Sequence, residues 1–253
     1  MKINRRQFVR NLGLGTASLS MGSLISTSSC APSGDSRDKR GKVSDDDQFL
    51  FIGDDIAIAQ TEYGKVQGYL LNHVYTFLGV PYGADTSGKN RFMPPQKPEP
   101  WTDVRPAVFY GNTAPQRMEN RWPNNYGTFA DHWNYWDVSE DCLYLNVWTP
   151  GIADGKKRPV LVWLHGGGFT NGSGIEQDGY HGENISREGD IVFCSINHRL
   201  GPIGFSDLSG VGGEAYKDSG NVGMLDIIAA LRWVHDNICL LYTSDAADDK
   251  ARV

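Results

Sequence analysis

A triple-glycine segment directly after an apolar run is the feature of this sequence that most clearly indicates chemistry. Residues 159–169 read Pro-Val-Leu-Val-Trp-Leu-His-Gly-Gly-Gly-Phe, so Gly166, Gly167 and Gly168 follow a predicted strand. Glycine lets the backbone turn sharply and approach a substrate closely. Backbone N–H groups in such a turn stabilise the negative oxygen that develops when a nucleophile attacks an acyl carbon. The pattern therefore predicts an oxyanion-binding turn.

A serine nucleophile to match this turn does not occur in the 253 residues. In sites of this kind the serine lies in Gly-x-Ser-x-Gly, and serine, acid and histidine all follow the glycine turn along the chain. That pattern is absent from the sequence. Ser206 comes nearest to it, but Leu208 stands where the second glycine should be, so Ser206 is interpreted as a loop serine. His165 is interpreted as a residue that fixes the turn rather than as a catalytic base.

Three short segments predict the strands around the turn. Residues 160–164 and 191–196 are almost continuously apolar and rich in branched side chains, which is typical of inner strands covered on both faces. Residues 142–148 alternate in character, which predicts a strand with one buried face.

A helix is predicted after these strands, from Asn221 onward, with Asp218, Ser219 or Asn221 available as its cap. Its apolar positions at helical spacing are Met224, Ile227, Ile228, Leu231, Val234 and Ile238. Strands that alternate with a helix imply an α/β sheet.

The segment before these strands predicts a small β-structure. Residues 56–77 contain short apolar runs broken at Gly64 and Gly68, which indicates an antiparallel meander. Residues 91–100 hold four prolines, which excludes a helix interior or a central strand. The folded part is thus expected to cover residues 49–238.

The N-terminus indicates export. Arg5 and Arg6 precede a weakly apolar, Gly/Ser/Thr-rich stretch that is short for a membrane span, so residues 1–30 are interpreted as a twin-arginine signal. The alternative is a frayed basic N-terminus. Small residues before Cys30 resemble a lipoprotein cleavage box, which leaves two outcomes open: lipid anchoring at Cys30, or cleavage and release. Residues 31–48 are polar and predict a flexible linker.

Composition excludes several classes of function. Hydrophobic residues make up 40% and charged residues 21%, which fits a globular chain. The net charge is −6, and the first 40 residues carry seven Lys or Arg against two Asp or Glu, which leaves 17 against 28 in the rest. This acidic body argues against nucleic acid as a partner. The four cysteines and six histidines show no metal-ligand spacing, so no metal site is predicted.

Four segments together resemble the type-B carboxylesterase family, which includes cholinesterases and para-nitrobenzyl-type esterases. They are residues 77–83, the Glu-Asp-Cys-Leu signature within 139–147, the strand and glycines at 160–169, and residues 197–205 with 220–226. The resemblance implies an α/β-hydrolase fold, cut before the nucleophile elbow. It implies that Gly167 and Gly168 donate oxyanion-hole N–H groups and that Gly166 shapes the turn. It implies a small-molecule ester substrate and no cofactor.

The sequence departs from this family at two places. The resemblance implies that the signature cysteine, Cys142, pairs with an upstream cysteine, but the matching position holds Ala114, so Cys142 is expected to be a free thiol. Residues 239–253 resemble translated adapter sequence and are interpreted as foreign to the fold. In cholinesterases, an aromatic loop in the region of residues 121–137 lines the substrate gorge; here ordinary packing of those aromatics is the favoured interpretation.

The sequence therefore predicts a serine carboxylesterase, present as a piece that holds the oxyanion hole without the catalytic triad and is inactive alone. Two alternatives stay open: a non-catalytic cholinesterase-like binding protein, and a piece that does not fold stably. The identity of the ester and the oligomeric state stay open as well.

Overall fold

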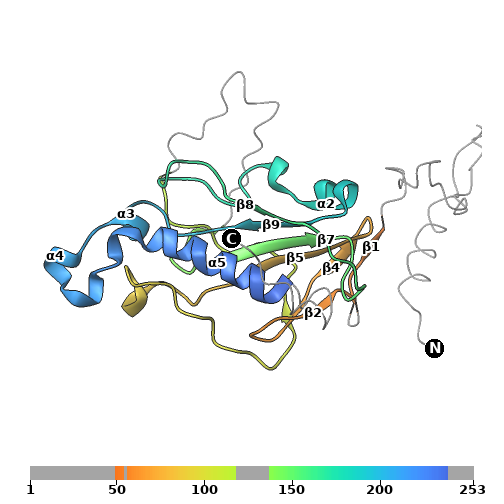
Figure 1. Ribbon diagram of the computed structural model, residues 1–253, viewed down its shortest axis with the longest axis horizontal. Coiled ribbons are helices and arrows are strands. Elements are labelled where there is room, and N and C mark those ends of the chain that lie inside the picture. Colours follow the sequence, from red (N-terminus) through yellow and green to blue (C-terminus); the bar gives the residue numbers. More distant parts are fainter. Residues whose placement is uncertain (1–48, 54–55, 118–136, 239–253) are drawn as a thin grey trace, which may run out of the picture. The chain divides into compact units, whose positions relative to one another are not determined.

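The central sheet of this protein has six strands in mixed directions (Figure 1). The computed structural model describes residues 49–53, 56–117 and 137–238; the predicted signal, linker and C-terminal tail lie outside these residues. In spatial order the strands are β1 (Leu50–Phe51), β4 (Tyr69–Leu71), β5 (Val74–Pro81), β7 (Tyr144–Thr149), β9 (Val192–Ile196) and β8 (Val160–Trp163). Within this sheet, as far as the described residues form it, β8 and β9 pair in parallel and the other neighbouring strands pair antiparallel.

Strand β7 is the centre of the core, between β5 and β9. Leu145 and Val147 belong to the larger apolar cluster on one face, and Trp148 belongs to a second cluster on the other face with Phe193. The prediction of one buried face was therefore wrong for this strand. The alternation of polarity shows only which side chains share a face. On the second face, the apolar Trp148 side chain is buried by packing, and Asn146 is buried with its side-chain amide donating to the Ser195 hydroxyl at 3.0 Å.

The two near-continuous apolar runs differ from each other in the structure. Every residue of β9 is buried, as predicted. Strand β8 is largely exposed, because among the described residues it pairs with β9 alone and lies at the edge of the sheet. The prediction that residues 160–164 form a covered inner strand was wrong for the chain as described.

The predicted meander is confirmed. Strands β2 (Ile58–Gln60) and β3 (Lys65–Gln67) pair antiparallel, as do β4 and β5, and β6 (Arg105–Pro106) joins β3 in a second, three-stranded sheet. Gly64 turns the chain between β2 and β3 at a φ of +152°, and a side chain there would collide with the Trp101 indole. Residues 91–100 contain neither a helix nor a strand, as the prolines predicted.

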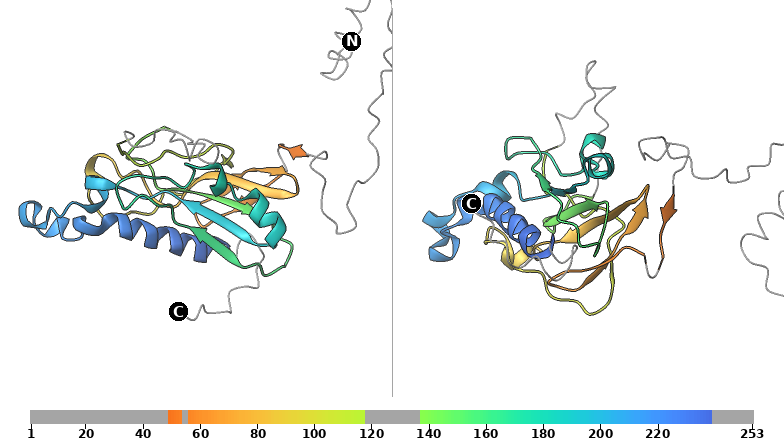
Figure 2. Two further views of the ribbon diagram at one scale, coloured as in Figure 1. Left: turned by 90° about the horizontal axis from the view of Figure 1, so that it is seen from above. Right: turned by 45° about the vertical axis from the view of Figure 1, so that its right-hand side comes forward.

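Helices cover both faces of the central sheet (Figure 2). Helix α5 (Val222–Ile238) packs on the face of the larger cluster through Ile227, Ala230 and Val234. Helix α2 (Glu183–Gly189) lies on the other face, where the Ser186 hydroxyl donates to the Trp148 carbonyl. The remaining helical segments are α3 (Gly201–Phe205), α4 (Ser209–Gly212), η1 (Gly88–Asn90), η2 (Asp178–Tyr180), η3 (Glu214–Tyr216) and η4 (Ser219–Asn221).

The predicted helix exists, but its buried stripe differs from the predicted one. Ile228 and Leu231 are exposed, whereas Asp226 and Asn237 are fully buried. The helix is therefore rotated relative to its apolar pattern, because two polar side chains hold it to its neighbours. Asn237 accepts a hydrogen bond from the Glu62 N–H at 2.6 Å, and the partners of Asp226 are described below.

We expect Cys142 and Cys194 to resist alkylation in the folded chain and to react once it is unfolded. Both thiols are free and fully buried, and burial raises the pKa of Cys194 to about 12 and that of Cys142 further. Almost no thiolate, the reactive form, therefore exists at pH 8 in the folded state. Differential alkylation without reductant, followed by peptide mapping, measures each thiol separately. A Cys142 peptide recovered as a disulfide would contradict the expectation.

Candidate functional site

The glycine turn follows β8 as a run of residues with positive φ. Gly167 has a φ of +117°, Gly168 of +60° and Phe169 of +67°. The loop closes on itself, because the Thr170 N–H and hydroxyl donate to the Gly167 carbonyl at 3.1 and 2.9 Å, and the Asn171 N–H reaches the same oxygen at 3.3 Å. A side chain at Gly167 would collide with the Asn171 backbone, so this closed shape requires glycine there.

The N–H groups of this turn are available to a ligand. Across residues 49–53, 56–117 and 137–238, neither the Gly167 nor the Gly168 amide donates a hydrogen bond. Both residues are exposed, and a Cβ added at Gly168 would meet no atom within 4 Å. Exposed N–H groups that have no acceptor among the described residues can donate to a developing oxyanion.

His165 and His198 connect the turn to the end of β9. Their rings stack with centroids 4.8 Å apart and planes 12° apart, and His165 Nδ1 lies 2.8 Å from the Gly166 carbonyl oxygen. His198 is almost fully buried, and desolvation lowers its pKa, which keeps the ring neutral at pH 7. These contacts agree with the interpretation of His165 as a residue that fixes the turn.

Phe169 ties the other end of the turn to α3. The Gly201 N–H donates to the Phe169 carbonyl at 2.7 Å, and the Phe169 and Phe205 rings lie 4.8 Å apart. Ser206 directly follows α3, and its N–H donates to the Pro202 carbonyl at 3.1 Å. It is therefore a post-helix loop residue, as the sequence indicated.

A buried ion pair supports the segment that holds the turn, and sequence reasoning missed it. Arg199 and Asp226 are both fully buried, with Nη2 to Oδ1 at 2.6 Å and Nε to Oδ2 at 2.8 Å. The Arg199 N–H also donates to Asp226, and Nη1 donates to the Met93 carbonyl at 2.8 Å. Burial raises the pKa of Asp226 and the guanidinium acts against that rise. A charged residue between apolar helix positions was the signal that pointed to such a partner.

The Glu-Asp-Cys-Leu signature stabilises the start of β7 rather than the glycine turn. Glu140 accepts two hydrogen bonds from Arg91, at 2.7 Å from Nε and 2.6 Å from Nη2. Asp141 accepts from the Tyr144 hydroxyl at 2.8 Å, and Cys142 is enclosed in the larger apolar cluster together with Ala114.

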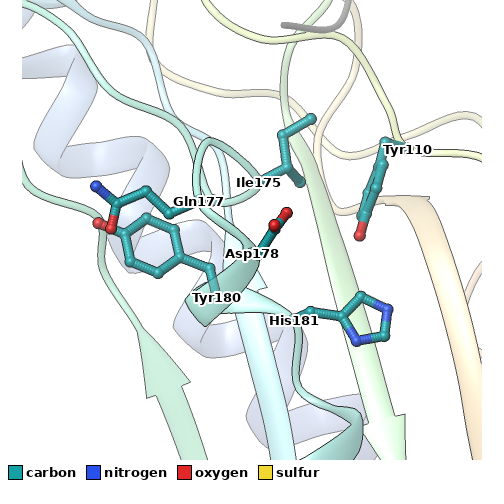
Figure 3. A pocket seen from close by; sticks show the side chains of 7 residues that line it. Tyr110, Ile175, Gln177, Asp178, Tyr180 and His181 are labelled. Atoms are coloured by element: carbon teal, nitrogen blue, oxygen red, sulfur yellow. The ribbon is translucent and has the colours of Figure 1, made fainter. Parts of the chain in front are cut away.

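Figure 3 shows a separate cavity of about 190 Å³, one of whose lining residues, His181, has its ring 5.1 Å from the Trp148 ring. It is lined by Tyr110, Gly174, Ile175, Gln177, Asp178, Tyr180 and His181. Burial raises the pKa of Tyr110 to about 12 and lowers that of His181, so both are neutral near pH 7. The cavity contains no residue of the glycine turn, so the two are distinct places on the molecule.

The residues that the structure describes contain no group of three His, Cys, Asp or Glu side chains able to hold a metal ion. The aromatic residues between 121 and 136, weighed above as gorge residues, lie outside the described part of the chain.

Comparisons with known proteins agree on one family. The sequence profile of the Carboxylesterase family matches residues 55–240. The para-nitrobenzyl esterase of Bacillus subtilis is 41% identical over 184 residues, which is 72% of this chain and 35% of that protein. The phenmedipham hydrolase of Pseudarthrobacter oxydans is 44% identical over 181 residues, or 72% of this chain and 34% of that protein.

The comparison of structures gives the same result. The Geobacillus stearothermophilus carboxylesterase EST55 is 39% identical to this chain, with a TM-score of 0.64. The match covers 74% of this chain and 36% of the solved one. The chain thus spans about a third of the length of the relatives that it matches.

Proposed function

This chain belongs to the carboxylesterase family and has the α/β-hydrolase fold, and on that premise we propose that it supplies the oxyanion-binding turn of a serine carboxylic ester hydrolase. In this reaction a serine hydroxyl attacks the ester carbonyl while a histidine takes its proton. The carbonyl oxygen becomes negative, the alcohol leaves, and water then cleaves the acyl-enzyme. The substrate class is a small-molecule carboxylic ester.

The observation that carries the proposal is the pair of backbone N–H groups in the glycine turn that have no acceptor among the described residues. The Gly167 and Gly168 N–H groups donate to no acceptor in the described part of the chain, and both residues are exposed. Gly166 links β8 to these donors, and its carbonyl is bound by His165 at 2.8 Å. Donors that are fixed before the reaction need no reorganisation when the oxyanion forms.

A chimera tests this function. Residues 55–238, the family-matched segment without the tail that begins at residue 239, would replace the corresponding segment of the Bacillus subtilis para-nitrobenzyl esterase, which supplies the rest of an esterase. We expect the chimera to hydrolyse para-nitrophenyl acetate and to lose activity on treatment with a serine-directed phosphonate. A folded chimera without serine-dependent turnover would contradict the proposal. The parent esterase, treated in the same way, is the control.

The 253-residue chain alone is expected to hydrolyse no ester above the buffer rate. Oxyanion donors stabilise charge only when an attacking group produces it, and these residues contain no Gly-x-Ser-x-Gly serine. The measurement is initial rates of the purified chain against para-nitrophenyl acetate at equal molarity with the chimera. Turnover that a serine reagent abolishes would contradict this expectation.

We also propose that the protein is exported through the twin-arginine pathway. Arg5 and Arg6 with the weakly apolar stretch after them support this, since that pathway reads the pair as an address. Among the described residues, none of the helices combines the length and apolar character that a membrane crossing needs.

Two fractionation experiments test the export proposal. Replacing both arginines with lysine should leave the precursor in the cytoplasm, and unchanged export would remove the twin-arginine interpretation. Cys30→Ala should release the protein from the membrane fraction if Cys30 is lipidated; an unchanged distribution would rule out that anchor.

A further inference from the structure

Gln116 contacts the glycine loop from a distant part of the chain. Its Oε1 accepts the Gly172 N–H at 2.7 Å, and its Nε2 donates to the Gly172 carbonyl at 2.9 Å. One carboxamide therefore pairs with both backbone groups of a single residue, as a neighbouring strand would. Among the common side chains, only an amide offers a donor and an acceptor in one such plane.

Gln116 itself sits on a fixed support. Thr113, three residues before Gln116, forms a parallel bridge with Val138, in which the Thr113 N–H donates to the Asp137 carbonyl at 2.8 Å and the Ser139 N–H donates to the Thr113 carbonyl at 3.0 Å. The carboxamide Nε2 also donates to the Ala114 carbonyl at 3.1 Å, which limits its rotation. The Gln116 side chain is thus held against the loop by the backbone that precedes the Glu-Asp-Cys-Leu signature.

Gly172 transmits this contact to the glycine turn. Its φ is +111°, and a Cβ added to it would collide with the Gly166 carbonyl oxygen and with His165 Nδ1. Gly172 is therefore packed directly on the backbone that leads into Gly167 and Gly168. The other side of the loop is held by the His165–His198 stack and by the bond from Gly201 to Phe169.

From this geometry we infer that Gln116 is a positioning residue, which sets where the Gly167 and Gly168 N–H groups point. The catalytic part of this inference rests on the proposed function. Gln116 acts through Gly172 and contacts no reacting atom. Without the carboxamide, the base of the loop loses two hydrogen bonds and Gly172 is left with an unpaired N–H and carbonyl. The donors would then no longer be fixed before the oxyanion forms.

The first test uses the 253-residue chain and needs no activity. In Gln116→Leu, hydrogen exchange of peptides covering residues 165–173 should be at least about tenfold faster, while peptides of β9 and α5 stay unchanged. Gln96→Leu is the matched control, because Gln96 is exposed and, within the described residues, its side chain donates only to the Pro94 carbonyl in its own loop. Unchanged exchange at 165–173, or an equal rise in β9 and α5, would overturn the inference.

The second test uses the active chimera. Gln116→Leu should lower kcat by about 10–100-fold with KM within about twofold, because the donors act in the transition state and not in substrate binding. Gln116→Glu, which keeps the acceptor for the Gly172 N–H, should retain more of the activity. A rise in KM with unchanged kcat, or a loss no larger than that of Gln96→Leu, would overturn the role. An inactive unmodified chimera would count against the proposed function instead, and the exchange test would still decide on Gln116.

Discussion

Replacing Asp226 with asparagine is expected to lower the free energy of unfolding by about 3–5 kcal/mol. Asparagine has nearly the same shape, so the change leaves the fully buried guanidinium of Arg199 without a counter-charge. The same change removes charge from three hydrogen bonds that join residue 199 to α5. Urea unfolding of the 253-residue chain, followed by tryptophan fluorescence, measures the difference.

An exposed ion pair provides the control for this result. Lys217 and Glu214 lie 2.9 Å apart, with 61% and 85% of their side chains exposed. Glu214→Gln should therefore change stability by less than about 0.5 kcal/mol. The double replacement Arg199→Met with Asp226→Leu should recover much of the lost stability, because a buried site without any charge is less costly than one that holds a single unpaired charge. A loss at Asp226→Asn no larger than that at Glu214→Gln would contradict the assigned importance of the buried pair.

The second large effect concerns catalysis in the chimera. Gly168→Pro should lower kcat by about 10²–10³-fold, because proline lacks the N–H that we assign to the oxyanion and cannot adopt a φ of +60°. Gly168→Ala keeps the N–H, and its Cβ meets no atom within 4 Å, so its loss should be clearly smaller. Initial-rate kinetics with para-nitrophenyl acetate separate kcat from KM in both variants.

A further variant separates the turn from the nearby serine. Ser206→Ala should leave kcat unchanged, since Ser206 is a loop residue after α3 whose N–H caps that helix. A near-normal kcat in Gly168→Pro would remove the role given to the Gly168 amide. Loss of activity in Ser206→Ala would instead point to a nucleophile that the sequence pattern does not indicate.

The sequence by itself determined the local elements and the place of the turn. Branched apolar runs predicted β8 and β9, glycine positions predicted breaks in the meander and the turn at 166–168, and helical spacing predicted α5. These features are local, because backbone preferences and side-chain periodicity act over a few residues. For the same reason, four short segments of the sequence were enough to show the resemblance to the family.

The tertiary structure alone determined which neighbours each strand and helix packs against. Among the described residues, the strand order alone places β8 at an edge and buries both faces of β7, since periodicity does not say how many neighbours a strand has. The Arg199–Asp226 pair and the Gln116 contact to Gly172 join residues 27 and 56 positions apart. Such contacts form when the chain folds back on itself, so a local pattern can indicate that a buried charge needs a partner but does not identify that partner. These contacts nevertheless hold the glycine turn in position. The sequence located the turn but did not determine its orientation.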